Sequence, residues 1–129
     1  MPKRPRLAAS ELEIAQIVWR LGEAGVRDVA EALPADRQLD FWTVQTYMRR
    51  LKAKGYLRTR REGRSNIYSA AVRPANVVRE LVSDFVDRTF GGQALPLVQQ
   101  LIDDHGLSDE EIDQLQTILD GLKRGGKQT

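Results

Sequence analysis

The strongest constraint on the fold is a change in hydrophobic period at Gly55. Before this residue, apolar side chains recur every three or four positions, which predicts three amphipathic helices. The predicted helices cover residues 11–21, 26–33 and 41–54. After Gly55, residues 56–60 and 66–70 have the composition of strands, and Gly63 between them can take the positive φ of a hairpin turn. Three helices followed by a hairpin predict a winged helix-turn-helix domain.

Beyond Pro74 the chain returns to a helical period. Three further helices each carry one apolar face, and residues 75–129 offer no layer to cover these faces. About 55 residues is a marginal length for an independent core, so we expect the faces to be buried in a homodimer. The side chains expected at this interface are Leu81, Phe85, Leu97, Leu101, Leu115 and Leu119. The predicted fold is mainly α with a small β-hairpin: a winged-helix domain (1–74) followed by a three-helix dimerisation domain (75–129).

Three local patterns predict where helices begin. Ser10 with Glu13, and Ser108 with Glu111, have the spacing of capping boxes, in which the hydroxyl and the carboxylate each accept a backbone N–H. Asp40 is a suitable N-cap for the third helix. We therefore expect helices to start directly after Ser10, Asp40 and Ser108.

Charge is divided unevenly along the chain, although the formal net charge is only +2. Residues 1–74 hold 15 basic and 8 acidic side chains, a net charge of +7, whereas residues 75–129 hold 5 basic and 10 acidic ones, a net charge of −5. A basic half joined to an acidic half predicts a polyanion-binding module with a separate accessory element.

The composition excludes several kinds of chemistry. The chain has no cysteine and a single histidine, His105, which leaves no thiol catalysis, no disulfide frame and no cysteine- or paired-histidine metal site. No apolar run approaches the roughly 18–20 residues of a membrane span, and no apolar segment of a secretory signal follows the basic start. We therefore expect a cytoplasmic protein that is not an enzyme, does not insert in a membrane, and uses no cofactor or metal.

The outer face of the third predicted helix is the first candidate for a binding surface. If Val44, Met48 and Leu51 point inward, the opposite face suits a DNA major groove, where Gln pairs with adenine, Arg with guanine, and an aromatic ring with thymine methyl groups. The candidates on this face and its flanks are Trp42, Thr43, Gln45, Thr46, Arg49 and Arg50. The alternative is an ordinary solvated helix face, which Trp42 and the neighbouring hairpin disfavour.

The hairpin is the second candidate. Between Arg49 and Arg64 the chain holds eight Lys and Arg residues and one acidic residue, Glu62. An arginine-rich tip with a glycine that permits close backbone approach suits phosphate or minor-groove contact, through Arg61 and Arg64. A solubilising charge run that protects an edge strand is the alternative. Because the basic residues lie on two adjacent elements, DNA binding is favoured.

Short motifs occur in a fixed order between about Ala9 and Leu122. They are Glu11–Trp19, Val26–Val29, Thr43–Thr46 with Arg50-Leu51 and Lys54-Gly55, Gly63-Arg64 with Tyr68, Phe90–Gly92, and Leu107–Ile112. In this order and spacing the chain resembles the BlaI/MecI (penicillinase repressor) family of winged-helix transcriptional repressors.

The resemblance implies a homodimer whose N-terminal domains bind a palindromic operator and whose C-terminal helices join the subunits. By position it places Thr43, Thr46 and Arg50 on the recognition helix, and Arg61 and Arg64 on the wing. It also implies a partner, a membrane metalloprotease that senses β-lactam and causes cleavage at an Asn-Phe pair. Gln100-Leu101 occupies that place in this chain, and the C-terminal cysteines of the family's copper-responsive branch are absent.

The leading prediction is a sequence-specific DNA-binding transcriptional repressor that acts as a homodimer on a pseudo-palindromic operator, with half-sites about one helical turn or a multiple of it apart. One alternative is a winged-helix adaptor whose basic face meets an acidic protein, without sequence-specific DNA binding. A second is a reader of RNA or DNA shape, which would bind many duplexes without strong sequence preference.

Overall fold

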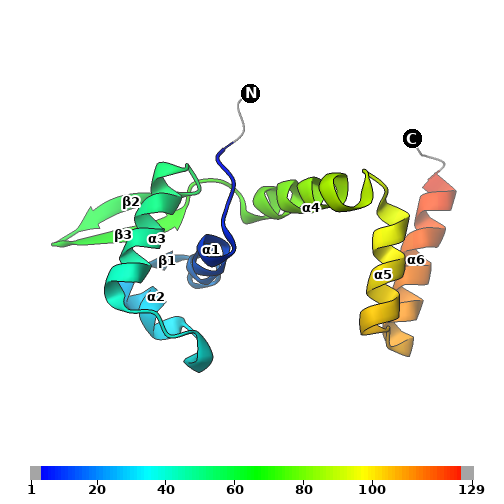
Figure 1. Ribbon diagram of the computed structural model, residues 1–129, viewed down its shortest axis with the longest axis horizontal. Helices are drawn as coiled ribbons and strands as arrows, with labels where there is room; N and C mark the ends of the chain where they lie inside the picture. The colour runs from blue at the N-terminus through cyan, green and yellow to red at the C-terminus, as the bar shows by residue number, and fades with distance from the viewer. Residues whose placement is uncertain (1–3, 126–129) are drawn as a thin grey trace. The chain divides into compact units, whose positions relative to one another are not determined.

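The computed structural model describes residues 4–125, which form six α-helices, a short 3-10 helix and three strands (Figure 1). The chain divides into two compact units, the first ending at Glu80 and the second beginning at Leu81. The predicted mainly α fold with a winged helix-turn-helix is confirmed. None of the helices among these residues is long and apolar enough to cross a membrane.

The first unit contains the winged helix and the start of a long helix. Its elements are α1 (Ala9–Leu21), β1 (Glu23–Ala24), α2 (Val26–Ala32), η1 (Ala35–Arg37), α3 (Phe41–Ala53), β2 (Leu57–Glu62), β3 (Ser65–Ala70) and the first residues of α4 (Pro74–Phe90). The three predicted helices therefore form within a few residues of their expected bounds.

The sheet is antiparallel, with β3 between β1 and β2. The hairpin is longer than expected, because Glu62 pairs with Ser65 and leaves Gly63-Arg64 as a two-residue turn. Gly63 has the predicted positive φ, at 62°. Strand β1 was not predicted, because two residues are too few for an alternating pattern. Only their pairing with β3, Glu23 with Ser69 and Ala24 with Tyr68, makes them a strand.

The core of the first unit lies between α1, α2, α3 and the sheet. The predicted inner face of α3 is fully buried, since Val44, Met48 and Leu51 have no exposed surface. Ile14 and Val18 of α1, Val29 of α2, and Leu57 and Tyr68 of the hairpin fill the rest, and α4 adds Val77. Burial of this face determines which side of α3 is left to solvent.

Two of the three predicted helix caps are confirmed. Asp40 Oδ1 accepts the N–H of Thr43 at 2.7 Å, and this hydrogen bond holds the pKa of the Asp40 carboxyl below its usual value. Ser108 Oγ accepts the N–H of Glu111 at 3.1 Å, and the Glu111 carboxylate accepts the Ser108 N–H at 3.0 Å. Helix α6 (Asp109–Gly125) therefore begins as predicted.

The predicted cap at Ser10 is wrong. Helix α1 begins two residues earlier than predicted, at Ala9, and the carboxylate that accepts a backbone N–H at its start is Glu11, from Ala8 at 2.9 Å. Glu13 is held instead by Arg37 of η1, whose Nη2 lies 2.6 Å from its Oε1. Glu13 thus serves a tertiary partner that a local spacing rule does not contain, while Glu11 caps the earlier start of the helix.

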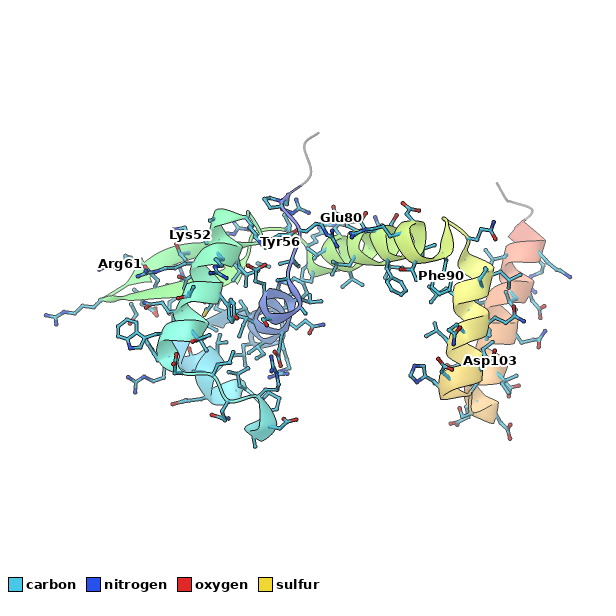
Figure 2. The ribbon with its side chains drawn as sticks, viewed as in Figure 1. Lys52, Tyr56, Arg61, Glu80, Phe90 and Asp103 are labelled. Atoms are coloured by element: carbon cyan, nitrogen blue, oxygen red, sulfur yellow. The ribbon has the colours of Figure 1, made fainter. Side chains whose placement is uncertain are left out.

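The chain before α1 is also held in place. Tyr56 Oη donates to the carbonyl of Pro5 at 2.8 Å, and the Arg4 guanidinium lies 5.3 Å from the centre of the Tyr56 ring. Arg4 also pairs with Glu80 of α4 at 3.1 Å; Figure 2 labels Tyr56 and Glu80. Arg4 therefore has an intramolecular role.

The second unit consists of the rest of α4, α5 (Ala94–His105) and α6. No residue between Leu81 and Gly125 is buried. Large apolar side chains are exposed on all three helices: Val82, Phe85, Leu95, Val98, Leu101, Ile102, Ile112, Ile118, Leu119 and Leu122. The expected interface residues Leu81, Leu97 and Leu115 are half-buried, whereas Phe85, Leu101 and Leu119 are exposed. The assignment of residues 75–129 to dimerisation stays a prediction.

Candidate nucleic-acid interface

The outward face of α3 presents the side chains that the sequence singled out. Trp42, Thr46, Arg49 and Arg50 are exposed, while Thr43 and Gln45 are half-buried on its flanks. Because the inner face packs in the core and Asp40 caps the first turn, the helix presents these side chains from a rigid backbone.

Several of these side chains are already oriented by contacts within the helix. Thr46 Oγ1 donates to the carbonyl of Trp42 at 2.9 Å. The Arg50 guanidinium lies 5.7 Å from the centre of the Tyr47 ring. The Trp42 ring meets Phe41 edge to face, with 5.7 Å between the ring centres.

The basic residues of the wing differ in whether they form ion pairs. Arg61 and Arg64 are exposed at the hairpin end, and Arg61 Nε donates to the carbonyl of Gly63 at 3.4 Å. Arg60, by contrast, pairs with Glu23 of β1 at 3.0 Å and with Glu62 at 3.4 Å. Figure 2 labels Arg61 on the hairpin and Lys52 on neighbouring α3.

Among the described residues, some basic side chains of the first unit are paired with carboxylates, and others are not. The engaged pairs are Arg4 with Glu80, Arg37 with Glu13, Lys54 with Glu11, and Arg60 with Glu23 and Glu62. Within residues 4–125, the predicted contacts Arg49, Arg50, Arg61 and Arg64 form no ion pair. Without a carboxylate of these residues in direct contact, the four guanidinium groups can bind phosphate and release its counterions.

A positive charge on α3 also acts on the hydroxyl of a tyrosine in the sheet. Tyr68 of β3 is almost fully buried, and its burial raises the pKa of the hydroxyl above 10.0, while the nearby charge of Arg49 opposes that rise. The charge of Arg49 on α3 therefore acts on a residue of the hairpin.

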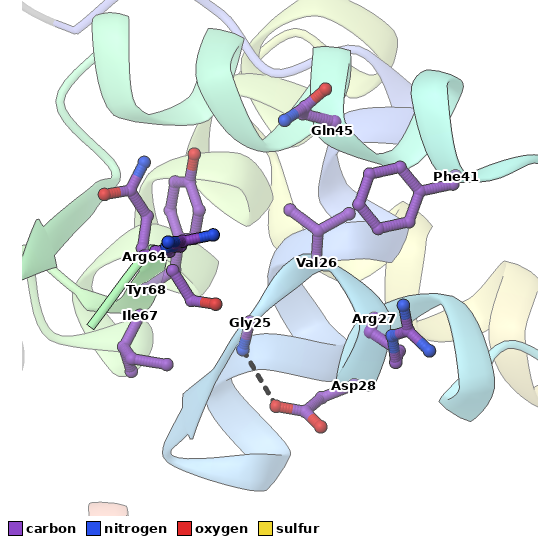
Figure 3. A pocket seen from close by; sticks show the side chains of 11 residues that line it. Gly25, Val26, Arg27, Asp28, Phe41, Gln45, Arg64, Ile67 and Tyr68 are labelled. Atoms are coloured by element: carbon purple, nitrogen blue, oxygen red, sulfur yellow. Dashed lines mark hydrogen bonds between the residues drawn. The ribbon is translucent and has the colours of Figure 1, made fainter. Parts of the chain in front are cut away.

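A pocket of about 410 Å³ joins α2, α3 and the wing (Figure 3). Gln45 of α3 and Arg64 of the hairpin line it together, so the fold brings two predicted contacts to one depression. Arg27 of α2 lines it as well, and it is exposed and forms no ion pair with any described residue. Arg27 was not among the predicted contacts, although it lies in the Val26–Val29 motif at the start of α2.

A helical core that presents a capped helix with exposed arginines beside an arginine-bearing hairpin defines a winged helix-turn-helix DNA-binding protein. The chain belongs to the penicillinase repressor family, whose model matches residues 7–121. The predicted resemblance is therefore confirmed, and the family consists of transcriptional repressors rather than enzymes.

Individual relatives and a solved structure are also similar to this chain. The chain is 27% identical to the penicillinase repressor of Bacillus licheniformis, over 99% of this chain and 100% of that one. It is 33% identical to an uncharacterised 16.5 kDa protein of Latilactobacillus sakei, over 88% of this chain and 77% of that one. The solution structure of the DNA-binding domain of the repressor BlaI matches with a TM-score of 0.51 and 28% identity, over 59% of this chain and 93% of that domain.

Proposed function

We propose that the chain is a transcriptional repressor that binds a pseudo-palindromic DNA operator as a homodimer. The observation that carries this proposal is the group of four predicted contacts, Arg49, Arg50, Arg61 and Arg64, which lie exposed on α3 and the wing without ion pairs among residues 4–125. Four other basic residues of the same unit, Arg4, Arg37, Lys54 and Arg60, are paired with carboxylates, whereas the four predicted contacts lie on the two elements that a winged helix applies to DNA.

In this proposal α3 lies in the major groove and the wing contacts the neighbouring backbone. Gln45 and the arginines of α3 donate hydrogen bonds to base edges, since Gln can form two hydrogen bonds with adenine and Arg two with guanine. Thr43 lies near the capped start of α3, where backbone phosphates are commonly held. Arg61 and Arg64 supply phosphate or minor-groove contacts.

The homodimer is proposed from the second unit. A stretch from Leu81 to Gly125 with no buried residue has no core of its own, and exposed apolar patches of this kind mark interaction sites. We assign Leu81, Phe85, Leu97, Leu101, Leu115 and Leu119 to the subunit interface. A second copy is the partner that a symmetric operator requires.

Selection from random duplexes at fixed salt tests the proposal. We expect recovery of a pseudo-palindrome whose half-sites lie about 10–10.5 bp apart, or a multiple of that distance, with at least about 10³-fold preference over random DNA. Enrichment of no sequence would contradict it. In that case, retained affinity for many duplexes would indicate a shape reader, and no affinity at moderate salt would indicate the adaptor.

A membrane metalloprotease sensor is the partner proposed for relief of repression. The bond that the resemblance points to, Gln100-Leu101, lies on the exposed surface of α5, where Gln100 Nε2 donates to Asp104 Oδ2 at 2.8 Å. Since proteases bind their substrates in extended form, cleavage there requires α5 to unwind first. A gene for such a peptidase beside this one, and cleavage of the purified dimer by that peptidase, would support the route; an intact chain after incubation would reject it.

A further inference from the structure

Trp42 is the most exposed large apolar side chain of the first unit, with 71% of its surface open to solvent. A tryptophan seldom stays this exposed unless it meets a partner, because the ring carries one of the largest apolar surfaces of any side chain. The fold does not need it, since the core side of α3 is filled by Val44, Met48 and Leu51.

The indole ring of Trp42 packs against a neighbouring aromatic side chain. Its ring meets Phe41 edge to face, at an interplanar angle of 87° and a centre-to-centre distance of 5.7 Å. Phe41 in turn lines the pocket that Val26 of α2 and Arg64 of the wing also line, and Figure 3 shows the Phe41 and Val26 side chains beside each other. Phe41 therefore acts as a positioning residue for the Trp42 ring.

The next turn of the helix adds no donor to this surface. The hydroxyl of Thr46 has one hydrogen, and that hydrogen is given to the Trp42 carbonyl at 2.9 Å. The Thr46 hydroxyl therefore offers no hydrogen to a base edge, and the surface formed by Trp42 and Thr46 consists of the indole ring with its single N–H and the Thr46 methyl group, which suits an apolar group.

The charged residues near Trp42 indicate what kind of ligand this surface binds. Arg49 and Arg50 follow on the same helix, exposed and without ion pairs among the described residues, so the ligand is a polyanion that carries an apolar group. In the major groove of DNA the only such group is the C5-methyl of thymine. We propose that Trp42, positioned by Phe41, reads a thymine methyl group in each half-site; this inference rests on the proposed function.

The test removes the methyl group alone. Each thymine of the selected half-site is replaced in turn by deoxyuridine, which keeps the base pair, and dissociation constants are measured with the full-length protein. We expect one position at which the methyl group strengthens binding by about four-fold, the value of burying one such group. In Trp42→Ala the thymine and deoxyuridine operators should bind equally at that position.

Three further variants test whether discrimination between thymine and deoxyuridine depends on the Trp42 ring and its contact with Phe41. Trp42→Phe keeps an aromatic ring and should keep part of the discrimination, whereas Phe41→Leu should reduce it because the indole loses its support. Leu21→Ala, which removes another exposed apolar side chain of the same unit at 44% exposure, should leave it unchanged. Circular dichroism verifies that each variant is folded.

The outcomes separate this inference from the proposed function. If the wild-type protein prefers its operator but binds thymine and deoxyuridine equally at every position, or if the half-site contains no thymine, methyl reading is wrong and the repressor proposal stands. If deoxyuridine lowers affinity equally in wild type and in Trp42→Ala, another residue reads the methyl group. If no operator is selected, both proposals are overturned.

Discussion

Lys54 Nζ lies 2.6 Å from Oε1 of Glu11, which ties the C-terminal end of α3 to the first turn of α1. The Glu11 side chain is 3% exposed and that of Lys54 25%. Lys54 also donates to the carbonyl of Arg6 at 2.7 Å, so one ammonium group joins three segments of the chain. Asp40 at the other end of α3 completes the support, and the helix is held at both ends.

The Glu11–Lys54 pair should contribute measurably to stability. Lys54→Ala leaves a buried carboxylate without its cation, and we expect a loss of about 2 kcal/mol in the free energy of unfolding. The measurement is urea denaturation at one protein concentration. Arg60→Ala is the matched control, because it breaks an exposed pair with Glu23, and it should leave the midpoint unchanged within error. Equal losses in the two variants would contradict the assignment.

The same pair makes stability depend on pH in a defined direction. Burial by itself raises the pKa of Glu11, but hydrogen bonds from Lys54 and the Ala8 N–H, with the charges of Lys54 and Arg50, bring it below the ordinary 4.5. The folded state therefore binds this proton less tightly than the unfolded state does. The stabilisation is complete above pH 4.5 and is lost as the pH falls through the lowered pKa.

Glu11→Gln should accordingly be less stable than wild type near neutral pH and should lose less stability on acidification. Thermal unfolding followed across a pH series that extends below 4.5 measures this. Glu31→Gln, at an exposed carboxylate of α2 with no ion pair to any described residue, should reproduce the wild-type profile. A parallel profile for Glu11→Gln and wild type would show that the Glu11 pKa is not lowered by folding.

Arg64 should contact phosphate without reading sequence. Arg64→Ala is expected to weaken binding to operator and random duplexes alike and to reduce the log–log slope of affinity against salt by about one. Arg60→Ala, on the same hairpin but already paired with Glu23 and Glu62, should change the slope less. An unchanged slope in Arg64→Ala would remove this residue from the interface.

The C-terminal helices should be required for dimerisation. Leu119→Asp places a charge on the exposed apolar face of α6, and we expect sedimentation analysis to find a monomer with reduced operator affinity. Gln116→Asp introduces the same charge at an exposed polar position of the same helix and should remain dimeric. A wild-type protein that sediments as a monomer would refute the proposed homodimer outright.

Much of the candidate site was predictable because it depends on local periodicity. The spacing of Val44, Met48 and Leu51 determines the buried side of α3, and the outward positions of Trp42 and Thr46 follow from it. The caps at Asp40 and Ser108 were predictable for the same reason, since each involves residues three positions apart. The cap at Ser10 was not, because Glu11 caps the helix by accepting the N–H of Ala8 and Glu13 pairs with Arg37, 24 residues away.

The sequence by itself therefore determined the helices, the hairpin, the outward face of α3 and the family to which the chain belongs. Only the tertiary structure decided which charges remain available. Arg60 and Arg64 are indistinguishable in a list of basic residues, yet one is paired with Glu23 and the other has no ion pair among the described residues. Such pairs join residues far apart in the chain, and Lys54 lies 43 positions from Glu11. Their formation depends on how the helices and the sheet pack, which no local pattern contains.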